Sequence, residues 1–430
     1  MTDWQRSEAA FGERWCTPAE ASALVEEGGD LASGLIEPTT LLAALAEREV
    51  GGSALIAVMA LGGLALAQAG RFRIRTGFAT PVSRALLEQG ACEYLPLTFA
   101  DAGRHMQEAS PDCVLVRLAP PDEQGRCSYG WAAGYTPDLV DLALRRGLPI
   151  LAEIDPSMPR TRSGREVPAE AIARACPAHG DPASDAPVPP SPHTEAIVRH
   201  LDPLIPDGAT LQVGIGSVPD AAVERLSASD LGIHTEVFGP GLARLLRKGQ
   251  ATGRRKARDR GTAVCTIASV DPDVRAAIEE SEGVEVRSAS EVLDPRRIAE
   301  HDRLRCINSA IAVDLRGQVN AETFGREQVA GVGGQLDFLR GAGLRADSLR
   351  IIALASTTSS GISRIVAGHP EGSVVTATRY DVDAVVTEHG VAPLRDRTDE
   401  ERARALIAVA HPDHRAALER ARFSGPADSQ

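Results

Sequence analysis

Apolar and polar residues alternate along this chain in two ways, and the pattern predicts a mixed α/β protein. Short apolar runs typical of buried strands occur at residues 113–118, 149–154, 210–213, 264–268, 284–287, 349–355 and 384–387. Amphipathic stretches with helical spacing lie between them, for example at residues 137–146. Because strands that alternate with helices build parallel sheets, we expect an α/β fold with parallel strands.

Two local signals in the last third of the chain predict individual elements. Thr398 and Glu401 have the spacing of a capping box, which predicts the start of a helix. Apolar residues then recur at helical spacing until Pro412, where we expect the helix to end. Residues 315–318 (LRGQ) separate two alternating runs and predict the turn of a hairpin.

A proline-rich segment divides the chain into two halves of similar size. Residues 177–192 contain six prolines and almost no large apolar side chains. Proline removes a backbone donor and fixes φ, so this segment predicts a linker rather than a helix or strand. A chain of 430 residues also exceeds the usual size of a single core. We therefore expect an N-terminal α/β domain at 1–177, a linker at 178–192 and a C-terminal α/β domain at 193–430.

The overall composition disfavours partners that carry many negative charges. The net charge is −13 and only 3% of the residues are aromatic, which argues against binding to nucleic acid or to an anionic membrane surface. The longest apolar run, residues 54–69, is short and contains Gly62 and Gly63. It is typical of a buried strand and helix rather than of a membrane span.

Cysteine usage and the N-terminal residues favour the cytoplasm. The chain has seven scattered cysteines and no C-x-x-C motif, so we expect reduced thiols and no zinc ribbon. The first residues contain no apolar signal core. His411 and His414 flank Pro412, which predicts a turn rather than a metal site. Neither a G-x-S-x-G nucleophile elbow nor a P-loop occurs.

An ordered set of motifs carries the most specific information. Glu236 closes a strand-like run (GIHTEVFG), and three motifs follow it at residues 307–321 (INSAIAVDLRGQVNA), 331–338 (GVGGQLDF) and 386–394 (VTEHGVAPL). In the N-terminal half, residues 119–135 and 151–161 fit the same pattern. Together these motifs resemble the acetyl-CoA hydrolase/transferase family, which includes 4-hydroxybutyrate CoA-transferases.

The resemblance implies a fold and an activity. The expected fold is two tandem Rossmann-like domains of the CoA-transferase type with the active site between them, commonly in a homodimer. The expected activity is transfer of CoA between a short-chain acyl-CoA and a carboxylic acid, by ping-pong exchange through a glutamyl-CoA thioester. The CoA thioester is then a substrate, and we expect neither a permanently bound cofactor nor a metal ion.

Three residues are predicted to carry the chemistry. Glu236 lies near the end of a strand, where α/β folds place ligand-binding groups, and its carboxylate is ionised at neutral pH. The alternative is a solvated loop carboxylate. By resemblance, the amide of Gly334 stabilises the oxyanion and Glu388 lines the site. Two carboxylates in one pocket would raise one pKa, which would let Glu388 donate a proton or position the entering acid. The alternative, an exposed acidic side chain in a turn beside His389, is about equally consistent with the sequence.

Glycine-rich turns and one arginine are predicted to bind the CoA substrate. Gly214 and Gly216 follow a strand and open a helix, so their amides can face an anion, although a purely structural turn is equally consistent. Gly331 and Gly333 allow close approach of the backbone to a ligand, or form a tight turn. Arg364 replaces the positive charge that relatives obtain from lysine in loop 356–365. The basic run at 254–260 predicts a solvated face or a contact to the CoA 3′-phosphate.

Two departures from the family pattern leave the activity open. Relatives have asparagine where this chain has Leu293, and loop 356–365 contains no lysine. Both changes allow two alternatives to the transferase: an acyl-CoA hydrolase on the same scaffold, in which water replaces the acceptor acid, and a noncatalytic relative that only binds CoA. The identity of the acyl donor and of the acceptor acid depends on pocket shape and is not predicted.

Overall fold

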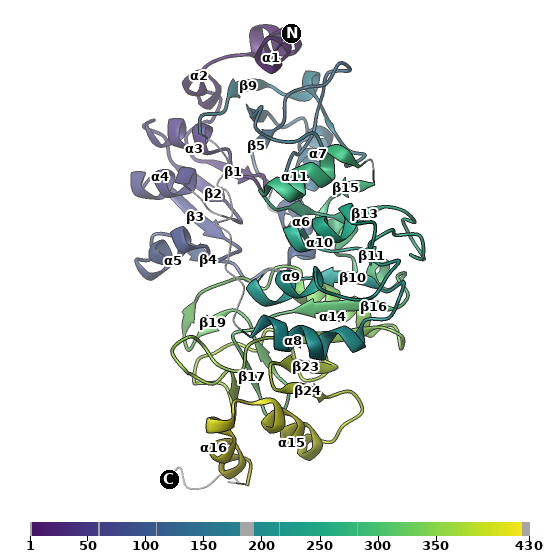
Figure 1. The fold of residues 1–430 in the computed structure, drawn as a ribbon. Helices are drawn as coiled ribbons and strands as arrows, with labels where there is room; N and C mark the ends of the chain where they lie inside the picture. Colours follow the sequence, from purple (N-terminus) through teal and green to yellow (C-terminus); the bar gives the residue numbers. More distant parts are fainter. Residues whose placement is uncertain are drawn as a thin grey trace. The chain divides into compact units, whose positions relative to one another are not determined.

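The computed structural model contains two compact units, each built around a mainly parallel sheet (Figure 1). It describes residues 2–58, 61–108, 110–180, 193–214, 216–281 and 283–423. The first unit comprises Met1–Asp185, Val264–Asp294 and Val329–Gly334, and the second comprises Ala186–Ala263, Pro295–Gln328 and Gln335–Gln430. The predicted α/β class is therefore confirmed. Most of the predicted linker, from residue 181 to residue 192, lies outside the described residues.

The first unit contains a seven-stranded sheet in the order β4-β3-β2-β1-β5-β7-β9. Its strands are β1 (Gly29–Ser33), β2 (Gly52–Leu55), β3 (Phe72–Thr76), β4 (Glu93–Tyr94), β5 (Cys113–Leu118), β7 (Ile150–Ile154) and β9 (Arg174–Pro177). All neighbouring pairs are parallel. The order reverses between β1 and β5, as in doubly wound folds.

Helices cover both faces of this first sheet. The helices that follow β1, β2 and β3 lie on one face, whereas α6 and α7 lie on the other (Figure 1). The helices of the first unit are α1 (Asp3–Phe11), α2 (Pro18–Ser22), α3 (Thr39–Ala46), α4 (Leu61–Ala69), α5 (Pro81–Glu88), α6 (Phe99–Glu108), α7 (Thr136–Arg146), α11 (Pro272–Glu280) and α12 (Ala289–Val292).

The apolar run at 54–69 contributes strand β2 and helix α4, as predicted. Gly62 lies at the start of α4, where a Cβ would come within 2.8 Å of the Thr39 backbone. Glycine at this position therefore allows α3 and α4 to pack closely. None of the helices that the structure describes combines the length and apolarity needed to cross a bilayer.

Three buried charged side chains connect the central strands of the first sheet. The Arg117 Nη2 atom lies 2.7 Å from Asp155 Oδ2, and its Nη1 atom lies 3.4 Å from Glu153 Oε1. Glu153 Oε2 also accepts hydrogen bonds from the amides of Thr40 (2.8 Å) and Leu41 (3.2 Å), at the start of α3. All three charged side chains are at most 4% exposed, so each depends on its partners for compensation.

The environment of Glu153 predicts how the stability of the folded protein depends on pH. Burial, opposed by the charge of Arg117, raises the Glu153 pKa from 4.5 to about 7. Between these values the folded protein keeps a proton that the unfolded chain releases, so this contribution to stability falls as the pH rises and is lost above about pH 7. We expect denaturant titrations to show this fall in the parent protein and not in Glu153→Gln. A pH-independent difference between the two would contradict the prediction.

The second unit contains a six-stranded sheet in the order β11-β10-β16-β21-β23-β24. Its strands are β10 (Thr210–Val213), β11 (Gly232–Ile233), β16 (Leu304–Asn308), β21 (Leu349–Ala353), β23 (Ala384–Thr387) and β24 (Gly390–Pro393). All pairs are parallel except β23 with β24. The strand order reverses between β10 and β16, which is where open α/β sheets bind ligands.

The remaining elements of the second unit surround this sheet. Helix α14 packs on β16 and β21, whereas α8 packs against α9 and β23. The helices are α8 (Thr194–Leu201), α9 (Ser217–Val223), α10 (Pro240–Arg247), α13 (Pro295–Ile298), α14 (Gln335–Gly343), α15 (Asp399–Val409) and α16 (Pro412–Phe423). Short strands are β17 (Ala312–Asp314), β18 (Val319–Asn320), β19 (Thr323–Phe324), β20 (Glu327–Gln328) and β22 (Ile365–Val366).

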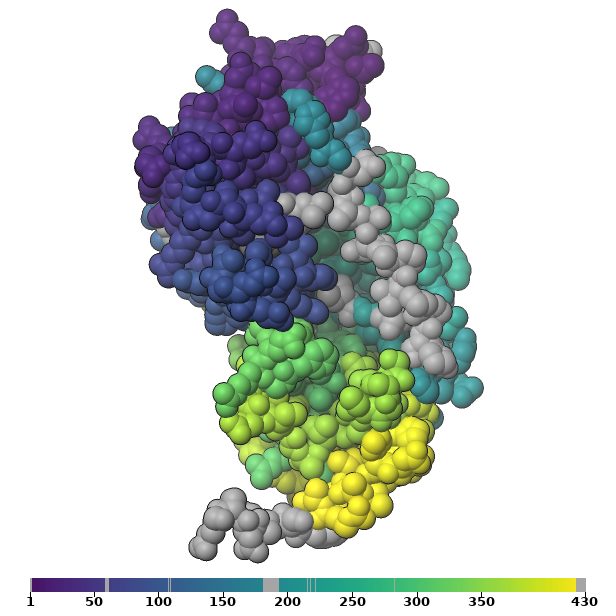
Figure 2. Space-filling view, turned by 90° about the vertical axis from the view of Figure 1, so that its left-hand side faces the viewer, coloured from purple at the N-terminus to yellow at the C-terminus, as the bar shows by residue number. Residues whose placement is uncertain are grey.

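The C-terminal helices confirm two predictions. Thr398 and Glu401 form the predicted capping box at the start of α15. That helix ends at Val409, before Pro412, as predicted, and Pro412 begins the separate helix α16, because proline at the first helical position loses no intrahelical hydrogen bond. The two helices form part of the surface of the second unit (yellow in Figure 2). The hairpin predicted at 315–318 is confirmed, since it joins the antiparallel strands β17 and β18.

The predicted domain boundary requires a correction. Residues 264–294 follow the proline-rich segment but belong to the first unit. The amide of Ala133 donates to the Thr266 carbonyl (3.0 Å), and the amide of Val286 donates to the Arg162 carbonyl (2.9 Å). The apolar runs predicted in this segment therefore form the short strands β13 (Ala263–Cys265), β14 (Ile267–Ala268) and β15 (Val284–Val286), outside the two parallel sheets.

Candidate active site

Most of the residues of the second unit that are predicted to act in the reaction lie at the carboxyl edge of its sheet. Strands β10, β11, β16, β21 and β23 run parallel, so their carboxyl ends meet at one edge. Gly214, Glu236, Ser309, Ser356 and Glu388 each lie at or shortly after one of these ends. Ligand-binding groups of α/β proteins occupy this edge.

Glu236 is placed by a segment that continues along β10. The amide of His234 donates to the Leu211 carbonyl (3.0 Å). The Thr235 hydroxyl donates to the Val213 carbonyl (3.1 Å) and accepts from the Val213 amide (3.2 Å). Thr235 is fully buried, whereas Glu236 is partly buried and lies in the bend between β11 and β12 (Val237–Phe238). The catalytic role of its carboxylate stays a prediction.

A buried amide pair lies at the point where the strand order reverses. Gln212 Nε2 donates to Asn308 Oδ1 (3.0 Å), and Asn308 Nδ2 donates to Gln212 Oε1 (2.9 Å). A Cβ on Gly214 would come within 2.5 Å of Asn308 Oδ1, so glycine is required here for packing. Gly216 has φ 142°, which L side chains rarely adopt. Sequence reasoning missed Gln212 and Asn308, although both are polar residues within apolar runs.

Glu388 is a buried hydrogen-bond acceptor, not an exposed acid. Its side chain is 6% exposed, and it accepts from the Ser356 amide (2.9 Å) and hydroxyl (2.6 Å). His193 and His389 lie 3.7 Å and 3.5 Å from its Oε1 atom. Burial raises the Glu388 pKa, but the hydrogen bonds and His193 outweigh it and lower that pKa overall. The lowered pKa disfavours proton donation by Glu388, and its other predicted role, positioning of the entering acid, stays a prediction.

The hydrogen bond from the Ser356 hydroxyl makes a second prediction. In Ser356→Ala, Glu388 loses one charge-assisted hydrogen bond that lowers its pKa, so its pKa should rise. If activity needs ionised Glu388, the acidic limb of the kcat/KM profile should move to higher pH. Ser363→Ala is the control, because that hydroxyl donates to the Ile365 carbonyl instead. An unmoved acidic limb would show that Glu388 does not control activity.

Arg364 braces the loop that follows β16. Its Nε atom donates to the Ile311 carbonyl (3.1 Å), and Gln335 Nε2 donates to the Ser309 carbonyl (2.9 Å) in the same loop. Burial lowers the Arg364 pKa, and the negative charge of Glu388 opposes that effect. Arg364 thus has a structural role, and its contact to CoA stays a prediction.

The GVGG segment is tightly seated in the first unit. A Cβ on Gly331 would come within 2.6 Å of the Phe78 ring. Gly333 has φ 55°, and its carbonyl accepts from the Phe99 amide (3.1 Å). Gly334 is buried and immediately precedes α14. Close packing therefore explains why residue 331 is glycine, and a positive φ explains why residue 333 is glycine. The contact of both residues to CoA and the oxyanion role of the Gly334 amide stay predictions.

Two other sequence features have structural explanations. Leu293 is fully buried in the first unit and follows α12, so its apolar side chain serves the core. In the basic run at 254–260, Arg254, Arg255 and Arg260 are exposed, as expected for a solvated face, whereas Lys256 is not. Lys256 is 1% exposed, and its Nζ atom donates to the carbonyls of Ile233 (2.9 Å) and Thr262 (2.6 Å).

Known proteins resemble this chain in sequence and fold over nearly their full length. The acetyl-CoA hydrolase/transferase C-terminal domain matches residues 272–422. The chain is 32% identical to the succinyl-CoA:cyclohexane-1-carboxylate CoA transferase of Geobacter metallireducens, covering 96% of this chain and 95% of that protein. It is 33% identical to the 4-hydroxybutyrate coenzyme A transferase of Clostridium kluyveri, covering 96% and 97%. RipA from Yersinia pestis has a TM-score of 0.89 at 30% identity, covering 98% of each chain. The chain therefore belongs to the acetyl-CoA hydrolase/transferase family, which confirms the predicted resemblance.

Proposed function

We propose that this chain is an acyl-CoA:carboxylate CoA-transferase that uses Glu236 as a covalent carrier. The observation that carries the proposal is the position of Glu236, partly buried at the carboxyl edge of a parallel sheet. Thr235 anchors it to the end of β10, beside the reversal of strand order. The relatives named above, which are CoA transferases by name and match over nearly their full length, support the same activity.

The proposed exchange proceeds through two kinds of covalent intermediate. The Glu236 carboxylate attacks the acyl-CoA thioester, forming an acyl-glutamyl anhydride and releasing CoA thiolate. The thiolate attacks the glutamyl carbonyl, which forms a glutamyl-CoA thioester and releases the first carboxylate. The acceptor carboxylate then attacks this thioester and reverses both steps. Each step exchanges one acyl bond for another, so CoA is a substrate and no resident cofactor is needed.

The remaining residues have supporting roles in this proposal. The amide of Gly334 donates to the oxyanion of the tetrahedral intermediates. Glu388 stays ionised because of Ser356 and holds the entering reactant in place, rather than donating a proton. Arg364 supplies positive charge for CoA binding. The glycine turns at Gly214 and Gly331 let the backbone approach CoA closely.

An exchange assay separates the transferase from its two alternatives. We expect labelled carboxylic acids to enter the acyl-CoA pool much faster than free thiol appears in the absence of an acceptor acid. Thiol release at the same rate without an acceptor would make the protein a hydrolase. CoA binding without turnover across a panel of short acyl-CoAs and acids would make it a noncatalytic relative.

Cytoplasmic location and homodimeric assembly belong to the same proposal. Within the part of the chain that the structure describes, all seven cysteines are free thiols and six are buried, which supports a reducing compartment. The homodimer rests on the family resemblance. Cell fractionation and light scattering test these two points, and a secreted or monomeric protein would contradict them.

A further inference from the structure

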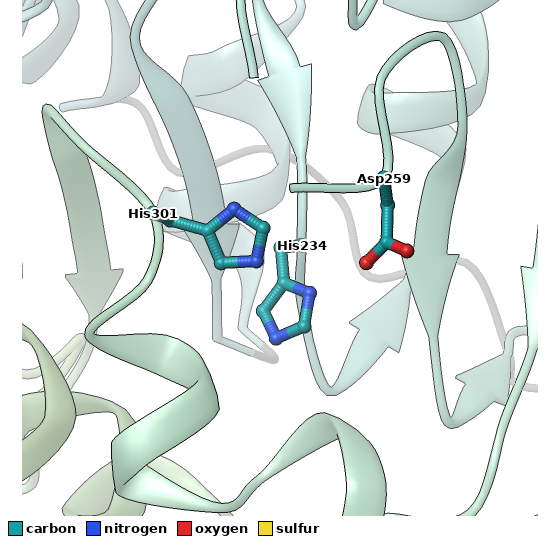
Figure 3. A group of neighbouring side chains, drawn as sticks. All are labelled: His234, Asp259 and His301. Atoms are coloured by element: carbon teal, nitrogen blue, oxygen red, sulfur yellow. The ribbon is translucent and has the colours of Figure 1, made fainter. Parts of the chain in front are cut away.

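Three potential metal ligands that the proposed exchange does not use converge in the second unit. They are His234 after β11, Asp259 in the loop before β13, and His301 between α13 and β16 (Figure 3). One ligand atom from each residue lies within 4.8 Å of the others. The two imidazole rings face each other with centroids 4.3 Å apart, and the Asp259 carboxylate lies beside His234 (Figure 3).

His301 is the strongest sign of a ligand at this cluster. It is 0% exposed, and neither ring nitrogen has a hydrogen-bond partner among the residues that the structure describes. Leaving both nitrogens unsatisfied in the interior is costly, and simple packing does not explain it. Neutral imidazole is the form in which histidine binds metal ions.

The charges around these three residues are compatible with a bound cation. Lys256 is buried nearby and opposes a second positive charge, but its Nζ atom is bound to the Ile233 and Thr262 carbonyls. The Asp259 carboxylate offsets this repulsion, and it lies 3.6 Å from the Arg258 Nε atom. The Asp259 side chain is 14% exposed, which provides a route for an ion from solvent.

We propose that His234, Asp259 and His301 bind a divalent transition-metal ion such as Zn²⁺. Two imidazoles and one carboxylate are a usual protein ligand set for zinc, with a fourth position left for water. At bond lengths of about 2.1 Å the ligand atoms must approach to about 3.4 Å, so small side-chain rotations close the site. The ion would tie together three segments that are distant in sequence, including the one that carries Glu236.

Metal titration of the chelator-treated, untagged protein tests this site. We expect one equivalent of Zn²⁺ to bind and to raise the Tm, and Co²⁺ to give the visible absorption of a tetrahedral complex. In Asp259→Asn we expect the affinity for Zn²⁺ to fall by at least about 10-fold. Asparagine keeps the shape and tolerates the left-handed backbone of Asp259 (φ 52°), so this variant should fold, as its circular dichroism can verify.

A second histidine row provides the matched control. In the same unit, the His411 ring packs against the rings of His389 and His414. His411→Gln should leave the affinity for Zn²⁺ unchanged. The proposal is overturned if the parent protein binds no stoichiometric metal, if Asp259→Asn binds as tightly as the parent, or if His411→Gln alone loses the ion.

Discussion

Glu236→Gln is expected to lower kcat for CoA exchange by at least about 10³-fold, because glutamine cannot form the anhydride that begins the reaction. The side chain keeps its size, and Thr235 still anchors the segment to β10. The variant should therefore fold normally and still bind acyl-CoA. Initial rates of exchange, together with binding measured by calorimetry, test both parts of this expectation.

A matched carboxylate in the same unit provides the control for this experiment. The Glu371 side chain is 89% exposed and forms an ion pair with Arg326 at the surface, so Glu371→Gln should retain the parent rate. Glu236→Asp should give an intermediate loss, since its carboxylate remains but is withdrawn from the substrate. An exchange rate in Glu236→Gln within a few-fold of the parent would remove Glu236 from the mechanism.

Arg117→Met is expected to lower the free energy of unfolding by about 3–5 kcal/mol, the largest effect on stability predicted for this chain. Arg117 is paired with both Glu153 and Asp155 in the interior of the first sheet. Without the guanidinium, the buried Asp155 carboxylate loses its ion pair, and the buried Glu153 loses the positive charge that lowers its pKa. Denaturant titration followed by circular dichroism measures the loss.

An exposed pair on the same sheet separates burial from charge pairing as the cause. Arg73 makes two hydrogen bonds to Glu93, but both side chains are more than half exposed. Arg73→Met should therefore leave the unfolding free energy near that of the parent. Equal losses in the two variants would show that burial of Arg117 does not determine its contribution.

The parallel sheets were predictable because their strands are short apolar runs with local signals. The runs at 113–118 and 210–213 match β5 and β10 along their full length, and Thr398 marks the start of α15. Residues 264–294 were assigned to the wrong unit for a physical reason. Their partners are backbone groups more than a hundred residues earlier, and such hydrogen bonds leave no pattern in the side chains.

The candidate site was predictable where a residue follows a strand and not where its environment decides its chemistry. Glu236 and Glu388 could be placed at strand ends from the sequence. The lowered pKa of Glu388 depends on Ser356, which another strand brings next to it. Lys256 is buried within a run of charged residues, because the Ile233 and Thr262 carbonyls accept its hydrogen bonds. Local charge density gives no indication of either effect.

Mass analysis of the enzyme after incubation with acyl-CoA and reduction with borohydride tests the covalent carrier most directly. Borohydride reduces a thioester to a primary alcohol and leaves free carboxylates unchanged. We expect peptide mapping to place this alcohol at Glu236, only after exposure to acyl-CoA, and to find none in Glu236→Gln. Full exchange activity with no modification at Glu236, or with the alcohol at Glu388 instead, would contradict the proposed mechanism.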